Sequence, residues 1–479
     1  MKCPLISILA LSLIMIEGCT VGPKYAKPTV PQPPTDSYKE LNGWKTAQPN
    51  DQALKGKWWE IFGDPQLNAL ENQVTVSNQN LKAAQARFEE ARATVRFNRA
   101  AQFPAVSIGA SIDALRRSGH APYFPSTHNS ADFVLPIDLS YEVDVWGRVR
   151  RTVAAAREEA QATAGDLETV SLSLHAELAL DYFELRSADA QKQLLDDTVK
   201  AYTDALQLTI NRFEGGAAPK SDVAQAKTQL DSTRVQDTDV TVQRAQFEHA
   251  IAVLIGRLPA QFTLPTLHSN LQPPALAIGL PSQLLERRPD IASAERRVAE
   301  ANEQIGIARA AFFPTVFLNG SAGFEGDSIT DWFGWPSRFW AVGPTMVETL
   351  FDAGRRRATS RAALANYDST VAAYRQTSLA AFQEVEDNLA ALRILDEEAQ
   401  QQKEATASAK ESLQIFTNRY IGGADPYLQV ITAQTAALQN ERNDVDILRR
   451  RIDASILLIK ALGGGWNVSQ LPTLSSVGN

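Results

Sequence analysis

The chain has very little cysteine and no long hydrophobic run after its first residues. Its 479 residues include two Cys, at positions 3 and 19, and five His. No later segment reaches the ~20 consecutive apolar residues that a transmembrane helix needs. No HExxH, CxxC, Walker loop or GxSxG element is present, so an enzyme ranks last among the function classes. His120 and His128 share one loop, where exposed His is the commoner interpretation, and we predict no metal site and no cofactor.

Residues 1–18 have the pattern of a secretory signal peptide. Lys2 gives a positive start, and the apolar run 5–16 is too short to span a bilayer as a mature helix. The run ends at Cys19, in a segment that resembles a bacterial lipobox, where the thiol receives diacylglycerol. Glu17 is unusual at such a site. We expect Cys19 to be acylated, and we expect no internal disulfide in the mature chain. The alternative is that Cys19 is an unmodified residue near a cleavage site.

The net charge of −8 argues against nucleic acid as a partner. Prolines crowd residues 20–37, which predicts an extended strap rather than helix or sheet. Trp58 and Trp59 are expected to pack as a small aromatic cluster against a core. Asp64 and Pro65 have the pattern of a helix start, and one helix is predicted over about 66–101.

A long stretch of the sequence occurs twice. Residues 147–256, shifted by 207 positions, lie on 354–463 without a gap. A second register with an offset of 210 carries 80–104 onto 290–314. A constant register of this length predicts two structural copies of one unit. The difference of three residues falls between the two matched stretches, as expected of a loop.

Apolar and polar residues alternate in four segments, two in each copy. The segments lie at about 106–113, 133–144, 315–325 and 338–351, and Glu348 interrupts the last one. Period two predicts strands with one apolar and one polar face, and each run has the length of a membrane-spanning β-strand. The alternation alone leaves a soluble β-sandwich open as the alternative.

The segment 147–213 predicts a long helix. It contains no Pro and a single interior Gly, so its ~67 residues extend roughly 100 Å. Its apolar residues recur at spacings of three and four, which indicates a narrow seam that packs lengthwise against partner helices. Gly215, Gly216 and Pro219 then predict a reversal of the chain into a return helix over about 220–256.

A membrane placement would impose an oligomer. Four strands cannot close a barrel, and an open sheet edge cannot persist in lipid. Three chains would supply twelve strands and twelve antiparallel helices around one axis. A tube of this kind is a passive duct.

Several segments resemble one protein family. They read CTVGPKY at 19–25, WW at 58–59, LLERRPDI at 284–291, ARAAFFP at 308–314, LFDAGRRR at 350–357, RYIGG at 419–423 and ALGGGW at 461–466. Nearly the whole chain is similar to the TolC-like outer-membrane channels of tripartite efflux pumps, and within them to the lipoprotein branch typified by OprM and NodT.

The resemblance implies a mainly α fold with a transmembrane β part and two structural repeats per chain. It implies a homotrimer, in which a twelve-stranded outer-membrane β-barrel continues into a periplasmic α-helical barrel with an equatorial belt. The implied function is a passive exit duct for small molecules such as drugs or toxic compounds. The implied partners are a periplasmic adaptor and an inner-membrane pump of the resistance-nodulation-division type. The protein would be lipid-anchored in the outer membrane.

The resemblance also places the periplasmic tip on the second turn. The candidate gate and tip residues are Arg419, Tyr420, Gly422, Gly423, Asp425, Leu428 and Thr432. Leu428 matches an apolar ring of the family, with ordinary helix packing as its alternative. An acidic ring of the family falls on Thr432, which carries no charge, and Asp425 is a possible substitute. The candidate adaptor-docking residues are Arg212, Gly215, Gly216 and Pro219. For Arg212 and Arg419 the alternatives are complementing a helix dipole and forming bonds within the tip.

The expected organisation has six parts. They are the signal peptide 1–18, a lipidated strap and equatorial segment 19–66, a first repeat 67–256 with a β-hairpin at about 104–145, a crossover 257–287, a second repeat 288–463 with a hairpin at about 314–351, and a tail 464–479. We expect the tail to be frayed after Trp466. Two alternatives to the efflux duct stay open. One is a channel for another exporter class, such as metal efflux or type I-like secretion, and the other is a structural helical protein without a pore.

Overall fold

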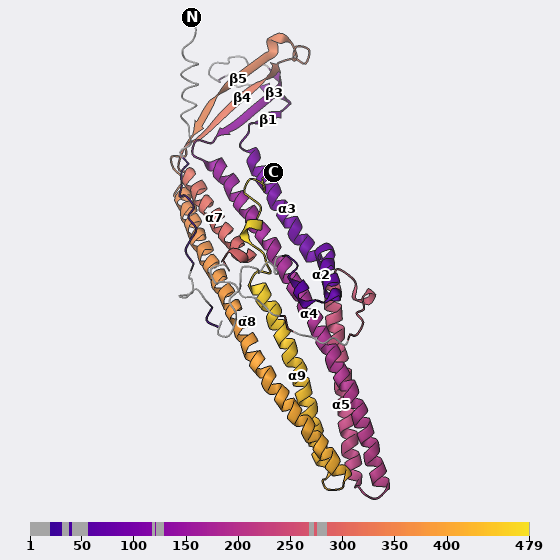
Figure 1. The fold of residues 1–479 in the computed structure, drawn as a ribbon. Helices are drawn as coiled ribbons and strands as arrows, with labels where there is room; N and C mark the ends of the chain where they lie inside the picture. The colour runs from indigo at the N-terminus through magenta and orange to yellow at the C-terminus, as the bar shows by residue number, and fades with distance from the viewer. Residues whose placement is uncertain are drawn as a thin grey trace.

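The protein is elongated, with a β-sheet at one end and a helical tip at the other (Figure 1). The computed structural model describes residues 20–30, 38–40, 56–116, 120, 129–267, 273–274 and 285–478. The predicted signal peptide and Cys19 lie outside these residues, as do His128 and part of the predicted crossover.

Four helices form the half of the molecule next to the sheet. Three of them, α3, α4 and α7, pack side by side in this order, and α8 packs on α7. Their bounds are Gln79–Ala100 for α3, Arg148–Glu214 for α4, Pro289–Ala310 for α7 and Arg355–Ile421 for α8. The two long helices α4 and α8 each contain 67 residues. The predicted long helix is therefore present in both copies.

The half toward the tip is built from α4 and α8 with the two return helices. These are α5 (Lys220–Leu254), which packs on α4, and α9 (Tyr427–Ala461), which packs on α8 and also contacts α4. The offset of 207 residues carries the bounds of α4 onto those of α8, and the bounds of α5 onto those of α9. Among the helices in the described part of the chain, none has both the length and the hydropathy needed to cross a bilayer.

The single helix predicted over 66–101 is wrong, because the chain breaks at Asn78. Helix α2 (Pro65–Ser77) ends there and α3 begins one residue later. The Asn78 carboxamide oxygen accepts from the backbone N–H of Leu81 at 3.0 Å, and its Nδ2 donates to the carbonyl of Leu254 at 2.8 Å. Tertiary contact with the end of α5 thus stabilises a cap in the middle of a helix-favouring sequence.

The strands form one antiparallel sheet in the order β1-β3-β4-β5, with β2 also paired to β3. Their bounds are Ala105–Ile108 for β1, Ser111–Arg116 for β2, Asn129–Val143 for β3, Thr315–Gly326 for β4 and Arg338–Val347 for β5. The four predicted segments are all strands, with two differences. The first is interrupted at Gly109, whose N–H bonds to the Pro136 carbonyl at 3.0 Å, and the fourth ends at Val347.

The register gathers the apolar side chains on one face of the sheet. One row across the strands is Ile108, Ile137, Ala322 and Trp340, and the neighbouring row is Val106, Leu139, Gly320 and Val342. On the other face Ser140 donates to Asn319, which donates to Thr345, each at 3.3 Å. This face therefore has a ladder of polar groups suited to water.

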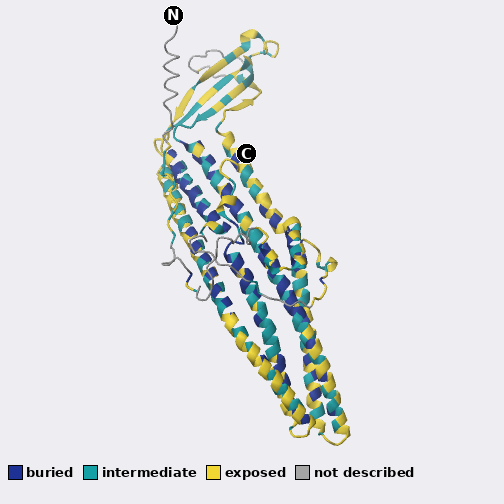
Figure 2. Ribbon diagram, in the orientation of Figure 1, coloured by how far each residue is buried: buried dark blue, intermediate teal, exposed yellow. Residues whose placement is uncertain are grey.

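The best-packed core lies in the middle of the molecule, where dark blue residues crowd the helices in Figure 2. Trp58 and Trp59, in the 3₁₀ helix η2 (Trp58–Phe62), are buried there, as predicted. The Trp59 ring stacks on His175 of α4, with centroids 4.4 Å apart. The sheet and the tip are more exposed (Figure 2).

The expectation of a frayed tail after Trp466 is wrong for its described part, 467–478. Val477 is buried against Val95 of α3 and Ala160 of α4. Gln161 donates to the carbonyl of Pro472 at 2.7 Å, and Arg99 donates to the carbonyl of Gly478 at 3.3 Å. Composition missed this because the partners of the tail lie more than 300 residues earlier in the chain.

Candidate functional site at the helical tip

Two tight turns form the tip. Gly216 and Gly423 have φ values of 73° and 77°, in the left-handed region that favours glycine. The N–H of Gly216 bonds to the carbonyl of Phe213, and that of Gly423 bonds to the carbonyl of Tyr420, each at 3.0 Å. The prolines at 219 and 426 cap the return helices α5 and α9. The reversals predicted from Gly215, Gly216, Pro219, Gly422 and Gly423 are thus present.

Arg212 joins the two turns. Its Nη1 donates to the carbonyl of Ile421 at 2.8 Å, and its guanidinium lies 4.8 Å from the centroid of the Tyr420 ring. Tyr420 in turn contacts Tyr427, with ring centroids 5.0 Å apart, and both rings are buried. Arg212 caps the end of α8 rather than its own helix, so a cation–π contact and a charged hydrogen bond hold the tip together.

Arg419 and Asp425 form a bidentate pair across the second turn. The Arg419 Nε and Nη2 donate to the two carboxylate oxygens at 2.6 and 3.0 Å. These hydrogen bonds lower the pKa of Asp425 below its usual value, so the group is ionised at neutral pH. The Asp425 carboxylate, the candidate substitute for the acidic ring, is therefore paired within its own turn.

Leu428 and Thr432 occupy the exposed face at the start of α9. The Leu428 side chain is 54% exposed, and the Thr432 hydroxyl donates to the Leu428 carbonyl at 3.0 Å. Leu428 therefore does not act as an ordinary packing residue within the chain. An exposed Leu one turn before a Thr offers an apolar surface and then a polar one on the same helix face.

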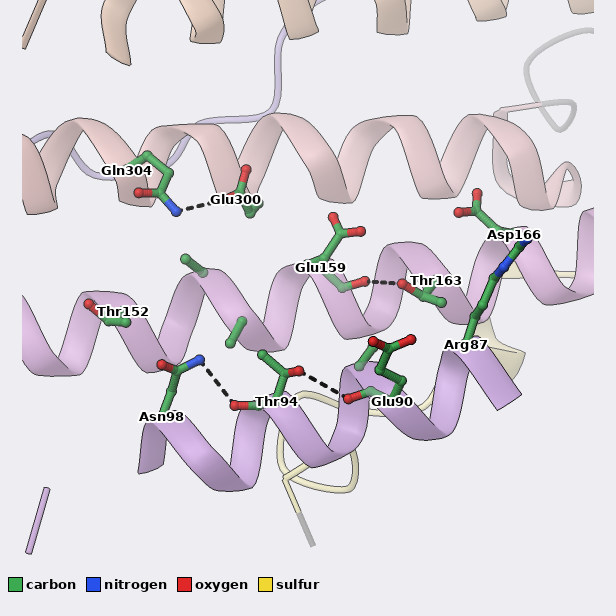
Figure 3. A pocket seen from close by; sticks show the side chains of 13 residues that line it. Arg87, Glu90, Thr94, Asn98, Thr152, Glu159, Thr163, Asp166, Glu300 and Gln304 are labelled. Carbon is green, nitrogen blue, oxygen red and sulfur yellow. Dashed lines mark hydrogen bonds between the residues drawn. The ribbon is translucent and has the colours of Figure 1, made fainter. Parts of the chain in front are cut away.

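A polar groove lies between α3, α4 and α7, nearer the sheet (Figure 3). It encloses about 510 Å³. Its charged lining residues are Arg87 and Glu90 of α3, Glu159 and Asp166 of α4, and Glu300 of α7. Burial raises the pKa of Glu159, and the nearby Arg297 lowers it. The residues that line the groove come from three helices far apart in the sequence, and no sequence motif marked them.

A second cluster that sequence reasoning missed lies between α4 and α9. The Arg449 Nη1 donates to Glu184 at 2.5 Å and to Asp453 at 2.8 Å. Burial, and then repulsion by Glu184, raises the pKa of Asp453 to about 7 despite the attraction of Arg449. Burial also raises the pKa of Asp181 to about 6. Within the described residues, no group of three or more His, Cys, Asp or Glu is arranged to hold a metal ion.

Asp453→Asn is expected to reduce the loss of stability as pH rises from about 5 to about 8. The folded-state pKa lies above the ordinary value, so the native protein holds a proton that the unfolded chain has released. Wild-type stability therefore falls as pH rises through about 7. The asparagine side chain does not ionise, so the variant should be more stable than the wild type at pH 8. Melting temperatures across this range measure the effect.

Asp204→Asn is the control, because it also removes one carboxylate, but an exposed one, on the neighbouring helix α4. Its melting temperature should follow that of the wild type at each pH. A pH slope in Asp453→Asn equal to that of the wild type would contradict the assignment.

The chain belongs to the outer membrane efflux protein family, whose model matches residues 70–257 and 280–464. The chain is 33% identical, over 98% of its length and 99% of the relative, to the probable efflux pump outer membrane protein SepC of Pseudomonas putida. It is 31% identical, over 98% of its length and 97% of the relative, to the outer membrane protein OprJ of Pseudomonas aeruginosa. The predicted family is therefore confirmed, and the chain is an outer-membrane efflux protein.

Solved structures of outer-membrane channels share the fold. The channel OprN superposes with a TM-score of 0.87 at 29% identity, covering 94% of this chain and all of the other. The open state of the MtrE channel of Neisseria gonorrhoeae gives a TM-score of 0.80 at 26% identity, covering 94% of this chain and 99% of the other. These relatives are channel and efflux proteins rather than enzymes.

Proposed function

We propose that three copies of this chain form the outer-membrane exit duct of a tripartite efflux pump. The observation that most directly supports this proposal is the open sheet. Within the described residues, β1 and β2 pair only with β3 at one edge, and β5 pairs only with β4 at the other. One face is apolar and the other polar, so the sheet suits a lipid–water boundary only if further copies pair its edges.

In the described residues, the helices also have two flanks with exposed apolar side chains. Along α8 the exposed large apolar residues are Leu364, Leu379, Ile394, Ile415 and Ile421. On α3 and α5, at the opposite flank, they are Phe97, Val235, Val242 and Val253. Apolar side chains on both flanks support a closed ring in which α8 of one copy packs against α3 and α5 of the next. With β1 and β2 counted as one interrupted strand, three copies would give twelve strands and a continuous helical barrel.

The tip is the proposed gate and adaptor-docking end. Leu428 is exposed near the turns and, repeated in three copies, would form an apolar constriction. The Arg419–Asp425 pair and the turn at Gly215 and Gly216 present charge and backbone groups at the extreme end. A periplasmic adaptor and an inner-membrane pump of the resistance-nodulation-division type are the proposed partners. One relative is named a toluene efflux pump outer membrane protein, which supports small apolar compounds as cargo.

Cys19 is the proposed lipid anchor. Thr20, the next residue, packs against Gly147 where the sheet meets α4, and the N–H of Val21 bonds to the Trp146 carbonyl at 3.1 Å. A lipid attached one residue before Thr20 would thus enter the bilayer beside the strand ends. Cys19→Ser is expected to abolish incorporation of radiolabelled palmitate into the protein. Equal labelling of the variant and the wild type would refute the anchor.

Single-channel recording tests the proposed duct. Detergent-extracted protein added to a planar bilayer should give discrete conductance steps, because the polar face of the sheet would line a water-filled lumen. A protein that is soluble without detergent, elongated, monomeric and unable to produce steps would instead support the structural helical alternative.

A further inference from the structure

Three arginines at the start of α8 have no partner in the described residues. Arg355, Arg357 and Arg361 are exposed, and none of their side chains makes an ion pair or hydrogen bond with those parts of the chain. Arg356, between them, differs because it bonds to Asp352 at 2.7 Å and lies 5.5 Å from the Phe312 ring centroid.

The corresponding start of α4 is neutralised within the chain. There Arg148 pairs with Glu142, Arg150 with Asp144, and Arg151 with Glu303. The second copy has equally many arginines in this region, but Asp352 serves only Arg356. Helix stability does not explain the excess charge, because cations near a helix N-terminus oppose the helix dipole. The three free guanidinium groups are therefore available to a partner from outside the described chain.

Their position identifies the class of partner. The segment between the end of β5 and the start of α8 carries Leu350, 91% exposed, and Phe351, 85% exposed. An apolar stretch followed by arginines is the arrangement that lies across the boundary between acyl chains and headgroups. The N-terminal strap reaches the same level, because Thr20 packs against Gly147 at the other sheet–helix junction.

We propose that Arg355, Arg357 and Arg361 bind the phosphate groups of anionic phospholipids in the periplasmic leaflet of the outer membrane. This inference rests on the proposed membrane placement. A guanidinium group binds a phosphate through two parallel hydrogen bonds, and Arg357 and Arg361, one helical turn apart, lie on the same face of α8. Leu350 and Phe351 would contact the acyl chains of the same lipids.

The test compares two triple variants of the full chain. One is Arg355→Gln, Arg357→Gln, Arg361→Gln. The matched control is Lys220→Gln, Lys227→Gln, Lys403→Gln, which removes the same charge from exposed positions far toward the tip. Delipidated protein in neutral detergent is titrated with phosphatidylglycerol or with phosphatidylethanolamine, and bound lipid is counted by native mass spectrometry.

The wild type and the lysine control should bind phosphatidylglycerol in preference to phosphatidylethanolamine. The arginine variant should bind phosphatidylglycerol about tenfold or more weakly, with no change for phosphatidylethanolamine. Unchanged phosphatidylglycerol affinity would overturn the proposal. Dissociation of the arginine variant without lipid, under conditions in which the lysine control stays assembled, would also overturn the proposal. The arginines would then contact a neighbouring copy rather than lipid. Conductance recorded on the same samples separates failure of the duct from failure of the lipid site.

Discussion

Replacing Arg186 by Ala is expected to destabilise the protein by about 3–5 kcal/mol, because the guanidinium belongs to a buried charge network. Its Nη1 donates to Asp189 at 2.7 Å and to the Pro265 carbonyl at 2.9 Å, while Nη2 donates to Gln66 at 2.6 Å. Arg186 and Asp189 are fully enclosed by α4 and its neighbours. Removing the arginine leaves Asp189 with Arg244 as its remaining cationic partner. Thermal unfolding of the purified protein measures the loss.

The second copy of the repeat provides the control. Arg393 lies 207 residues after Arg186, but it is partly exposed and pairs with Glu40 of the strap at 2.7 Å. An ion pair open to water contributes about 0–1 kcal/mol, so Arg393→Ala should shift the melting temperature only slightly. Equal shifts for the two variants would contradict the distinction between a buried and an exposed pair.

Leu428→Ser is expected to raise the resting conductance of the channel strongly. The side chain projects from the start of α9, and in the proposed trimer three copies would form a dewetted constriction that a hydroxyl group would hydrate. Since Leu428 packs little within its own chain, the substitution should change the free energy of unfolding by less than about 0.5 kcal/mol. Single-channel recording without adaptor or pump measures the opening.

Leu428→Met is the matched variant, because it keeps an apolar side chain of similar volume, and its resting conductance should equal that of the wild type. A conductance in Leu428→Ser no higher than that of the methionine variant would rule out an apolar gate at this position. Asp425→Asn tests the acidic alternative separately, by removing the charge that Arg419 pairs with in the second turn.

The parts of the fold that local patterns determine were predictable from the sequence. The constant offset of 207 residues placed both helix pairs, and the Gly-Gly and Pro residues placed both turns. Alternation placed the strands and separated their faces. Asn78 and the tail were mispredicted because their partners, Leu254 and residues 95–161, lie far away in the sequence.

The candidate site was predictable only in part, for the same reason. The family resemblance placed Arg212 and Arg419 at the tip, but the bond from Arg212 to Ile421 spans 209 residues and leaves no local signal. The raised pKa of Asp453 depends on burial and on Glu184 of another helix. Arg186 and Asp189 of α4 are buried, and no local pattern marked them.

The mass of the detergent-extracted protein, measured by native mass spectrometry, tests the account most directly. In the described residues the sheet has one apolar face and two unpaired edges, which partner copies would pair in a membrane. The account therefore predicts a stable particle of three chains. A stable single chain that stays folded and soluble without detergent would contradict it.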